Sequence, residues 1–138
     1  MRQGRRIGID VGDVRIGVAV CDPDGMLATP VETVAAGPDA IGRLAELARE
    51  YDAIECVVGM PVGLSGREGP AARKVRAFCD DLLAAIDPMP IRLFDERMST
   101  MTAESLLRQG GRSASSKRSV IDQAAATVIL QTALDSER

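Results

Sequence analysis

Three acidic positions interrupt the apolar pattern of this sequence in ways that point to chemistry. Asp10 lies in the middle of an apolar run, with a glycine two residues away on each side. The pair Asp95-Glu96 directly follows a second apolar run, and Asp122 precedes the apolar stretch near the end of the chain. A buried carboxylate without a partner is unfavourable, so Asp10 in particular requires a cation or several hydrogen-bond donors.

The residue types that are missing narrow the chemistry further. Histidine is absent, and the three cysteines (Cys21, Cys56 and Cys79) are scattered without a C-x-x-C pair. This excludes Ser-His-Asp and Cys-His catalysis and argues against a Cys/His zinc site or a disulfide framework. Acid–base chemistry is left to carboxylates, Tyr51, lysine or metal-bound water. Two divalent ions about 3.5–4 Å apart between carboxylates can hydrolyse a phosphodiester bond without histidine. Mg²⁺ or Mn²⁺ suits such an all-oxygen site.

Each acid also has a structural reading that the pattern leaves open. Asp10 could be satisfied by a nearby arginine or by turn amides. Asp95-Glu96 could be a solvated pair before a helix, where the helix dipole favours negative charge. Ser119 and Asp122 fit a capping box, in which Asp122 is the acid in the first turn of the last helix.

The elements that must position these acids follow the order β-β-β-α-β-α-β-α-α. Alternating apolar residues predict strands over 6–11, 15–21 and 26–34, joined by tight turns as antiparallel hairpins. Short apolar runs predict further strands over 54–58 and 91–94, and these should lie parallel because helices alternate with them. Helical spacing predicts helices over 41–51, 71–86, 99–109 and 118–134. The prediction is a mixed five-stranded sheet flanked by helices.

The face of the first strand that carries Asp10 is unusually small. Period-two alternation puts Gly8 and Gly12 on that face, and the partner strand adds Gly17 and Ala19. Such small residues cannot fill a core. We therefore expect a groove with the Asp10 carboxylate at its floor.

Composition limits the class of protein. The chain has 138 residues, of which 46% are hydrophobic and 27% charged, which predicts one domain over residues 1–138. The net charge of −3 excludes a nonspecific cationic coat for DNA but leaves room for a local basic patch. Aromatic residues make up 2%, so stacking platforms for bases are nearly unavailable. No apolar run is long enough to cross a membrane, and the basic N-terminus is not followed by a signal-peptide core, so we expect a cytoplasmic protein.

Basic residues near the acids are candidates for phosphate contacts. Arg67 lies in a glycine-rich loop over 59–70, whose amides and following helix could hold a phosphate, although an ordinary turn-rich connection fits equally well. Lys117 and Arg118 fall in a stretch that we read as a mobile polar loop before Asp122. Arg97, next to Glu96, completes the set. A charge run of this kind is more often a solvated surface.

Four motifs together resemble a known family, the YqgF family. The motifs are Ile7-Gly8-Ile9-Asp10-Val11-Gly12 with Arg15-Ile16-Gly17-Val18-Ala19; Val58-Gly59-Met60-Pro61 with Gly66, Glu68 and Gly69; Asp95-Glu96-Arg97-Met98-Ser99-Thr100; and Lys117 followed by Ile121-Asp122-Gln123-Ala124-Ala125-Ala126. They occur in order over nearly the whole chain. The family consists of RNase H-like proteins described as Holliday junction resolvases and as pre-16S rRNA nucleases.

The resemblance implies an RNase H-like fold and a hydrolase acting on nucleic acid, either precursor 16S rRNA or branched DNA. It implies that Asp10, Glu96 and Asp122 are the catalytic, metal-binding acids and that the cofactor is Mg²⁺ or Mn²⁺. The ribosome is a candidate partner. Resolution of a junction needs two symmetric cuts and so predicts a homodimer, whereas trimming an RNA end is compatible with a monomer.

Two other functions stay open from the sequence. The acidic composition and the scarcity of aromatic residues also suit a module of the same fold that binds nucleic acid or the ribosome without cleaving it. Asp10-Val11-Gly12 also resembles the phosphate loop of the sugar-kinase and actin-like fold, but those proteins enclose ATP between two lobes and this chain is long enough for one.

Overall fold

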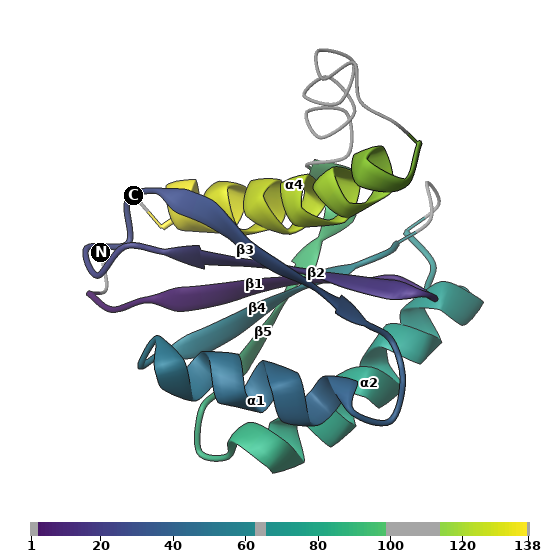
Figure 1. Cartoon of the computed structure of the whole chain (residues 1–138), viewed down its shortest axis with the longest axis horizontal. Coiled ribbons are helices and arrows are strands. Elements are labelled where there is room, and N and C mark those ends of the chain that lie inside the picture. The colour runs from purple at the N-terminus through teal and green to yellow at the C-terminus, as the bar shows by residue number, and fades with distance from the viewer. Residues whose placement is uncertain (1–2, 63–65, 99–113, 138) are drawn as a thin grey trace.

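A five-stranded mixed sheet forms the centre of the computed structural model, which describes residues 3–62, 66–98 and 114–137 (Figure 1). The strands are β1 (Arg6–Val11), β2 (Arg15–Cys21), β3 (Ala28–Ala35), β4 (Glu55–Met60) and β5 (Ile91–Asp95). Their order across the sheet is β3-β2-β1-β4-β5. The first three strands are antiparallel neighbours, and β4 and β5 run parallel to β1. The predicted mixed sheet is confirmed.

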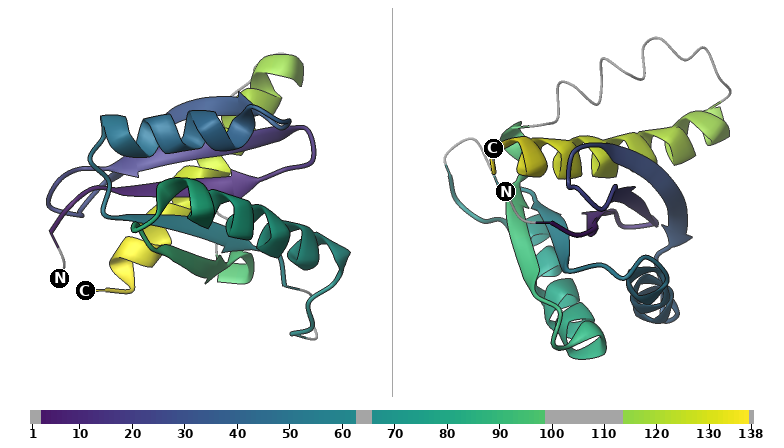
Figure 2. Two further views of the ribbon diagram at one scale, coloured as in Figure 1. Left: turned by 90° about the horizontal axis from the view of Figure 1, so that it is seen from below. Right: turned by 90° about the vertical axis from the view of Figure 1, so that its left-hand side faces the viewer.

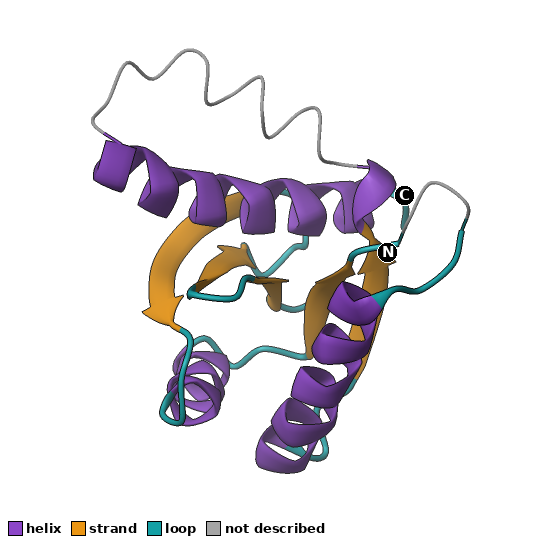
Figure 3. Ribbon diagram, turned by 90° about the vertical axis from the view of Figure 1, so that its right-hand side faces the viewer, coloured by secondary structure: helices purple, strands orange, loops and turns teal. Residues whose placement is uncertain are grey.

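Helices cover both faces of this sheet (Figures 2 and 3). The helices α1 (Ala40–Glu50) and α2 (Pro70–Ile86) pack on one face, and α4 (Ala114–Asp135) packs on the other. A short 3-10 helix, η1 (Glu96–Met98), directly follows β5. The helix predicted over 99–109 lies outside the described residues. None of the helices in the described ranges has the length and apolar character needed to span a membrane.

The two faces of β1 and β2 carry side chains of very different size. Ile7, Ile9 and Val18 are fully buried in the core under α1 and α2. The opposite face, with Gly8 and Gly17, lies under α4. The period-two prediction for these strands is confirmed, and the contrast explains how a helix can approach one face much more closely than the other.

The small face is not the open groove that we expected, because α4 packs directly onto it. A Cβ atom added to Gly8 would lie 2.7 Å from Cβ of Leu130, and one added to Gly17 would lie 1.9 Å from the carbonyl oxygen of Asp122. The glycines therefore permit backbone contact between sheet and helix. The expectation of an open groove on this face is wrong, because α4 packs closely against the sheet there.

The last helix also begins earlier than predicted. α4 starts at Ala114, whereas the pattern placed its first residue near Arg118. Lys117 and Arg118 are therefore helical in their backbone and do not belong to a loop. Asp122 lies in the third turn, so the capping-box reading with Ser119 is wrong. The small polar residues before Arg118 misled the prediction, since such residues are also common in loops.

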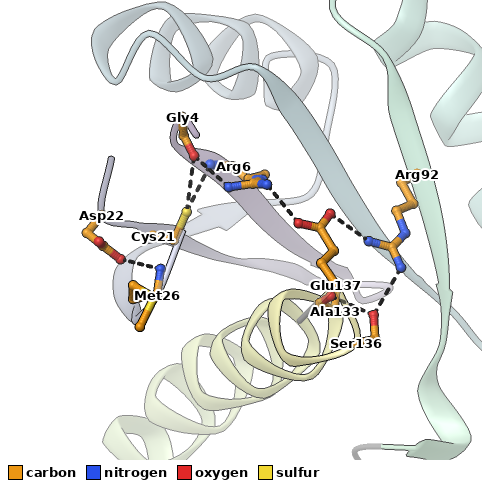
Figure 4. A network of polar contacts seen from close by, with 9 residues as sticks. All are labelled: Gly4, Arg6, Cys21, Asp22, Met26, Arg92, Ala133, Ser136 and Glu137. Carbon is orange, nitrogen blue, oxygen red and sulfur yellow. Dashed lines mark hydrogen bonds and ion pairs between the residues drawn. The ribbon is translucent and has the colours of Figure 1, made fainter. Parts of the chain in front are cut away.

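A polar network anchors the C-terminal end of α4 to the sheet (Figure 4). The fully buried Arg6 of β1 donates from Nη2 to Oε2 of Glu137 at 2.8 Å. Arg92 of β5 donates from Nη1 to the other carboxylate oxygen of Glu137 at 3.2 Å and from Nη2 to Oγ of Ser136 at 3.2 Å. Two strands thus hold the end of one helix, which restricts how far α4 can slide along the small face.

Candidate active site

Asp10 lies near the carboxyl end of β1, in the middle of the sheet. It pairs with Gly17 of β2 and is partly buried. It lies on the face that α4 covers, as the alternation of β1 requires. A rigid central strand with neighbours on both sides therefore holds this carboxylate in place.

Glu96 reaches Asp10 from the end of β5. A Cβ added to Gly59 of β4 would lie 2.6 Å from Oε1 of Glu96, so the glutamate side chain lies directly over Gly59. Gly59 follows Val58, which pairs with Ile9, and this register places Gly59 beside Asp10. The side chains of Asp10 and Glu96 share a hydrogen bond.

Proximity and burial change the ionisation of Glu96. Its pKa is raised to about 8, first by burial, then by the hydrogen bond with Asp10 and by the negative charges of Asp10 and Asp95. A carboxyl group so placed holds a proton at neutral pH in the absence of a cation. The two acids therefore share a site in which a positive charge would be favourable.

Asp122 completes the group from α4. Its carbonyl oxygen lies over Gly17, the strand partner of Asp10. Burial raises the pKa of Asp122, the charge of Asp10 raises it further, and the positive charge of Arg15 lowers it. Asp122 is thus within electrostatic range of both Asp10 and Arg15.

The three carboxylates are neighbours but do not form a closed cage. No group of three Asp, Glu, Cys or His side chains in the part of the chain that the structure describes has the geometry of a ready metal site. The hydrogen-bonded pair of Asp10 and Glu96 could supply two ligands, and the charge of Asp10 acts on Asp122. The donor set is all oxygen, partly buried and of like charge, which fits a divalent cation of the Mg²⁺ or Mn²⁺ type.

Asp95 and Glu96 have different surroundings, although they are adjacent in the chain. Nε of Arg97 donates to Oδ2 of Asp95 at 2.9 Å, and the backbone N–H of Arg97 donates to Oδ1 at 2.9 Å. This contact lowers the pKa of Asp95. Asp95 is therefore paired with Arg97, while Glu96 faces Asp10.

The structure gives different information about each of the four predicted phosphate-binding residues. Arg97 is close to it but pairs with Asp95, and its side chain is 43% exposed. Arg67 is exposed between β4 and α2, with no contact to the three acids among the described residues. Lys117 and Arg118 precede Asp122 by about one helical turn, and their side chains lie outside what the structure describes.

Arg15 is a residue near the acids that the sequence reading did not single out. It begins β2 and shares a face with Gly17. The sequence contained a signal for its position. Arg15 is two residues before Gly17, the strand partner of Asp10, so strand alternation puts Arg15 on the same face of the sheet as Asp10.

A mixed five-stranded sheet, with one acid on its central strand, a second after a parallel strand and a third on the covering helix, defines a nuclease with the RNase H-like fold. Comparison with known proteins agrees with this class. Residues 4–136 match the RuvX family, described as Holliday junction resolvase, and the chain belongs to this family. The resemblance to the YqgF motifs is thereby confirmed, and so is the prediction of a nuclease that hydrolyses phosphodiester bonds.

Close relatives extend over the whole chain. A protein of Streptomyces avermitilis named as a pre-16S rRNA nuclease is 60% identical over 140 residues, covering 100% of this chain and 90% of its own length. A protein of Thermobifida fusca with the same name is 54% identical over 145 residues, covering 100% of this chain and 91% of its own length.

Solved structures confirm the fold. RuvC of Thermus thermophilus in complex with a Holliday junction superposes with a TM-score of 0.62 at 18% identity, covering 97% of this chain and 95% of RuvC. The resolvase of fowlpox virus with its junction DNA gives a TM-score of 0.63 at 7% identity, covering 96% of this chain and 98% of the resolvase. The RNase H-like prediction is confirmed at the level of the fold.

Proposed function

We propose that this protein is a Mg²⁺- or Mn²⁺-dependent nuclease that processes the end of precursor 16S rRNA. The observation that carries the proposal is the contact between Asp10 and Glu96, with Asp122 beside Asp10 on the helix that covers them. The name shared by relatives that are 50–60% identical over nearly the whole chain favours precursor rRNA as the substrate.

In this proposal the three acids hold the ions, and the basic residues bind the nucleic acid. Divalent ions held by Asp10, Glu96 and Asp122 would supply the acidification of the attacking water and the stabilisation of the leaving 3′ oxygen. Asp10 supplies the most rigid ligand because its strand is central. Glu96, whose pKa is raised in the metal-free site, would give up its proton when a cation is held there, so that Asp10 and Glu96 would both be anionic. Arg67, Arg97, Lys117 and Arg118 contact phosphates on either side, with Arg97 exchanging Asp95 for a phosphate.

A junction-resolving activity is the second candidate, favoured by the description of the family that matches residues 4–136. A duplex junction and an RNA end present similar phosphates to such a site, so the active-site geometry supports both. The two candidates differ in assembly, because two symmetric cuts require two copies of the site. Sedimentation of the protein with and without a four-way junction separates them.

Cleavage assays on a precursor 16S fragment and on a four-way DNA junction, with Mg²⁺ and with Mn²⁺, test the proposal. Asp10→Asn and Asp122→Asn should each abolish cleavage while the circular dichroism spectrum stays unchanged. Asp24→Asn is the matched control, because Asp24 is exposed in the turn between β2 and β3. Full activity of either active-site variant, free of contaminating nuclease, contradicts the proposal. Retention of function in vivo by an Asp10→Asn, Glu96→Gln double variant indicates a non-cleaving binding module instead.

A further inference from the structure

The start of β2 is fixed tightly against the end of β1. The backbone N–H of Gly12 donates to the carbonyl oxygen of Arg15 at 2.9 Å. A Cβ added to Gly12 would lie 2.5 Å from the same oxygen, so the hairpin closes only because this position is glycine. Gly12 is two residues after Asp10. The backbone of Arg15 therefore has a set position relative to Asp10.

Strand alternation places Arg15 on the face that carries the acids. Ile16 and Val18 are buried in the core under α1 and α2. Arg15 and Gly17 must then face the side of α4. Gly17 pairs with Asp10 and lies under the backbone of Asp122.

The guanidinium of Arg15 carries a charge near the site, and no residue that the structure describes pairs with it. Arg15 is two residues from Gly17 on the same face of β2, and the backbone of Asp122 packs over Gly17. In agreement with this placement, the positive charge of Arg15 lowers the pKa of Asp122, although burial of Asp122 has the larger and opposite effect. No side chain within the described ranges forms a hydrogen bond or an ion pair with Arg15. Four other arginines are each held by a carboxylate: Arg43, Arg76, Arg92 and Arg97.

We propose that Arg15 binds the phosphate group that Asp10, Glu96 and Asp122 act on. The inference rests on the proposed nuclease function and assigns a phosphate-binding residue to the same site. A guanidinium has planar paired donors that match two phosphate oxygens, and among the described residues none accepts a hydrogen bond from the side chain of Arg15 at the edge of the acidic group. Its charge also offsets the repulsion between the carboxylates and a polyanionic substrate.

Binding measured separately from cleavage tests this role. The probes are a fluorescein-labelled precursor 16S fragment and a labelled four-way DNA junction, titrated in Ca²⁺ over a range of salt concentrations. Arg15→Ala should weaken the affinity for whichever probe the wild type binds by about 10- to 100-fold, as expected for loss of a charge-assisted contact. The slope of log affinity against log salt should fall by about 1. Arg15→Lys should recover part of the affinity.

Arg49→Ala is the matched control, since Arg49 is an exposed arginine in the last turn of α1, in the layer on the opposite face of the sheet. Mn²⁺ binding, followed by calorimetry, should persist in Arg15→Ala. If Arg15→Ala binds the probes with wild-type affinity and salt slope, the proposal is overturned. It is also overturned if that variant loses Mn²⁺ binding but keeps the salt slope, because Arg15 would then act on the acids alone. Absence of cleavage by the wild type counts against the nuclease proposal and leaves the binding result independent.

Discussion

The contact between Asp10 and Glu96 places two acids where, without a cation, one of them must keep its proton. Burial and the neighbouring charges raise the pKa of Glu96 to about 8. Like charges in a partly buried site oppose folding, and enzymes accept such strain where it serves binding. The acidic cluster therefore lowers the stability of the folded, metal-free protein, and a bound divalent ion would remove this destabilisation.

The pH dependence of folding stability should reveal this destabilisation by the acidic cluster. The folded-state pKa of Glu96 is above its ordinary value of 4.5, so the protonated group contributes stability that is complete below about pH 4.5. This contribution is lost as the pH rises from about 4.5 to about 8. In EDTA, Glu96→Gln should therefore have a higher melting temperature than the wild type at pH 8, and the difference should vanish near pH 4.

Glu46→Gln, an exposed position on α1, serves as the control and should follow the wild-type profile. Addition of Mg²⁺ or Mn²⁺ should stabilise the wild type at pH 8 more than it stabilises Glu96→Gln. Parallel melting profiles for the wild type and Glu96→Gln would show that Glu96 does not keep its proton in the folded protein.

At the scale of elements, the close contact of α4 with the sheet is what brings Asp122 to Asp10. The contact depends on Gly17, because the carbonyl oxygen of Asp122 occupies the place of its missing side chain. Even one added methyl group requires a backbone shift, and overpacking of this kind typically costs about 1–3 kcal/mol or more.

Gly17→Ala should accordingly lower the free energy of unfolding strongly and reduce cleavage together with it. Gly42→Ala is a control of opposite sign: Gly42 is inside α1, and a Cβ there meets nothing within 4 Å. That substitution should stabilise by about 0.5–1 kcal/mol, because alanine is the better helix former. Urea denaturation measures the free energy of unfolding of both variants. A Gly17→Ala protein of wild-type stability would contradict the packing described for α4.

The polar network that anchors the C-terminal end of α4 gives a second prediction at the scale of elements. Arg6 is completely buried, and its side chain pairs with Glu137 at 2.8 Å. Removal of one partner leaves a buried charge uncompensated, which typically costs about 3–5 kcal/mol. Glu137→Ala should lower the free energy of unfolding by that order in urea denaturation. Glu50 is an exposed residue of α1, so Glu50→Ala should change the free energy of unfolding by less than about 1 kcal/mol. Equal effects of the two substitutions would mean that the polar network around Glu137 does not anchor α4.

Local pattern predicted the elements whose side chains alternate or repeat regularly and failed where long-range packing decides. The strands β1 and β2 were predicted from alternation alone. The start of α4 was not, because Ala114 and the serines after it are small and carry no periodic signal, and helix propensity is a weak guide when tertiary contacts stabilise a helix.

The same distinction applies to the candidate site. The acids could be proposed from their unusual positions and from the motifs. Two contacts could not be predicted in this way: the pairing of Arg97 with Asp95 and the proximity of Arg15 to Asp122. They depend on side-chain orientation and on how closely α4 approaches the sheet, and the residue pattern specifies neither.

At the scale of the whole molecule, an acidic protein acts on a polyanion. The net charge is −3, so long-range electrostatics oppose binding and local contacts must compensate. Part of this opposing charge lies in Asp10, Glu96 and Asp122, the acids that we propose to be catalytic. A cation held there would serve binding as well as chemistry.

Neutralising one of these acids should therefore strengthen binding in the absence of metal. In EDTA, Asp122→Asn should bind the labelled precursor fragment more tightly than the wild type does, although it cannot cleave. Asp24→Asn, which changes the net charge equally but far from the site, should have a smaller effect. Fluorescence anisotropy measures both affinities. Equal gains for the two variants would indicate that only the overall charge matters.

The most direct test of the account is an anomalous diffraction map of crystals soaked in Mn²⁺. The account predicts a peak within coordinating distance of the carboxylates of Asp10 and Glu96, with the side chain of Asp122 turned toward it, and no such peak in Asp10→Asn. Crystals saturated with Mn²⁺ that show no peak at these three residues, or a peak bound by other residues only, would contradict the claim that these acids form the catalytic metal site.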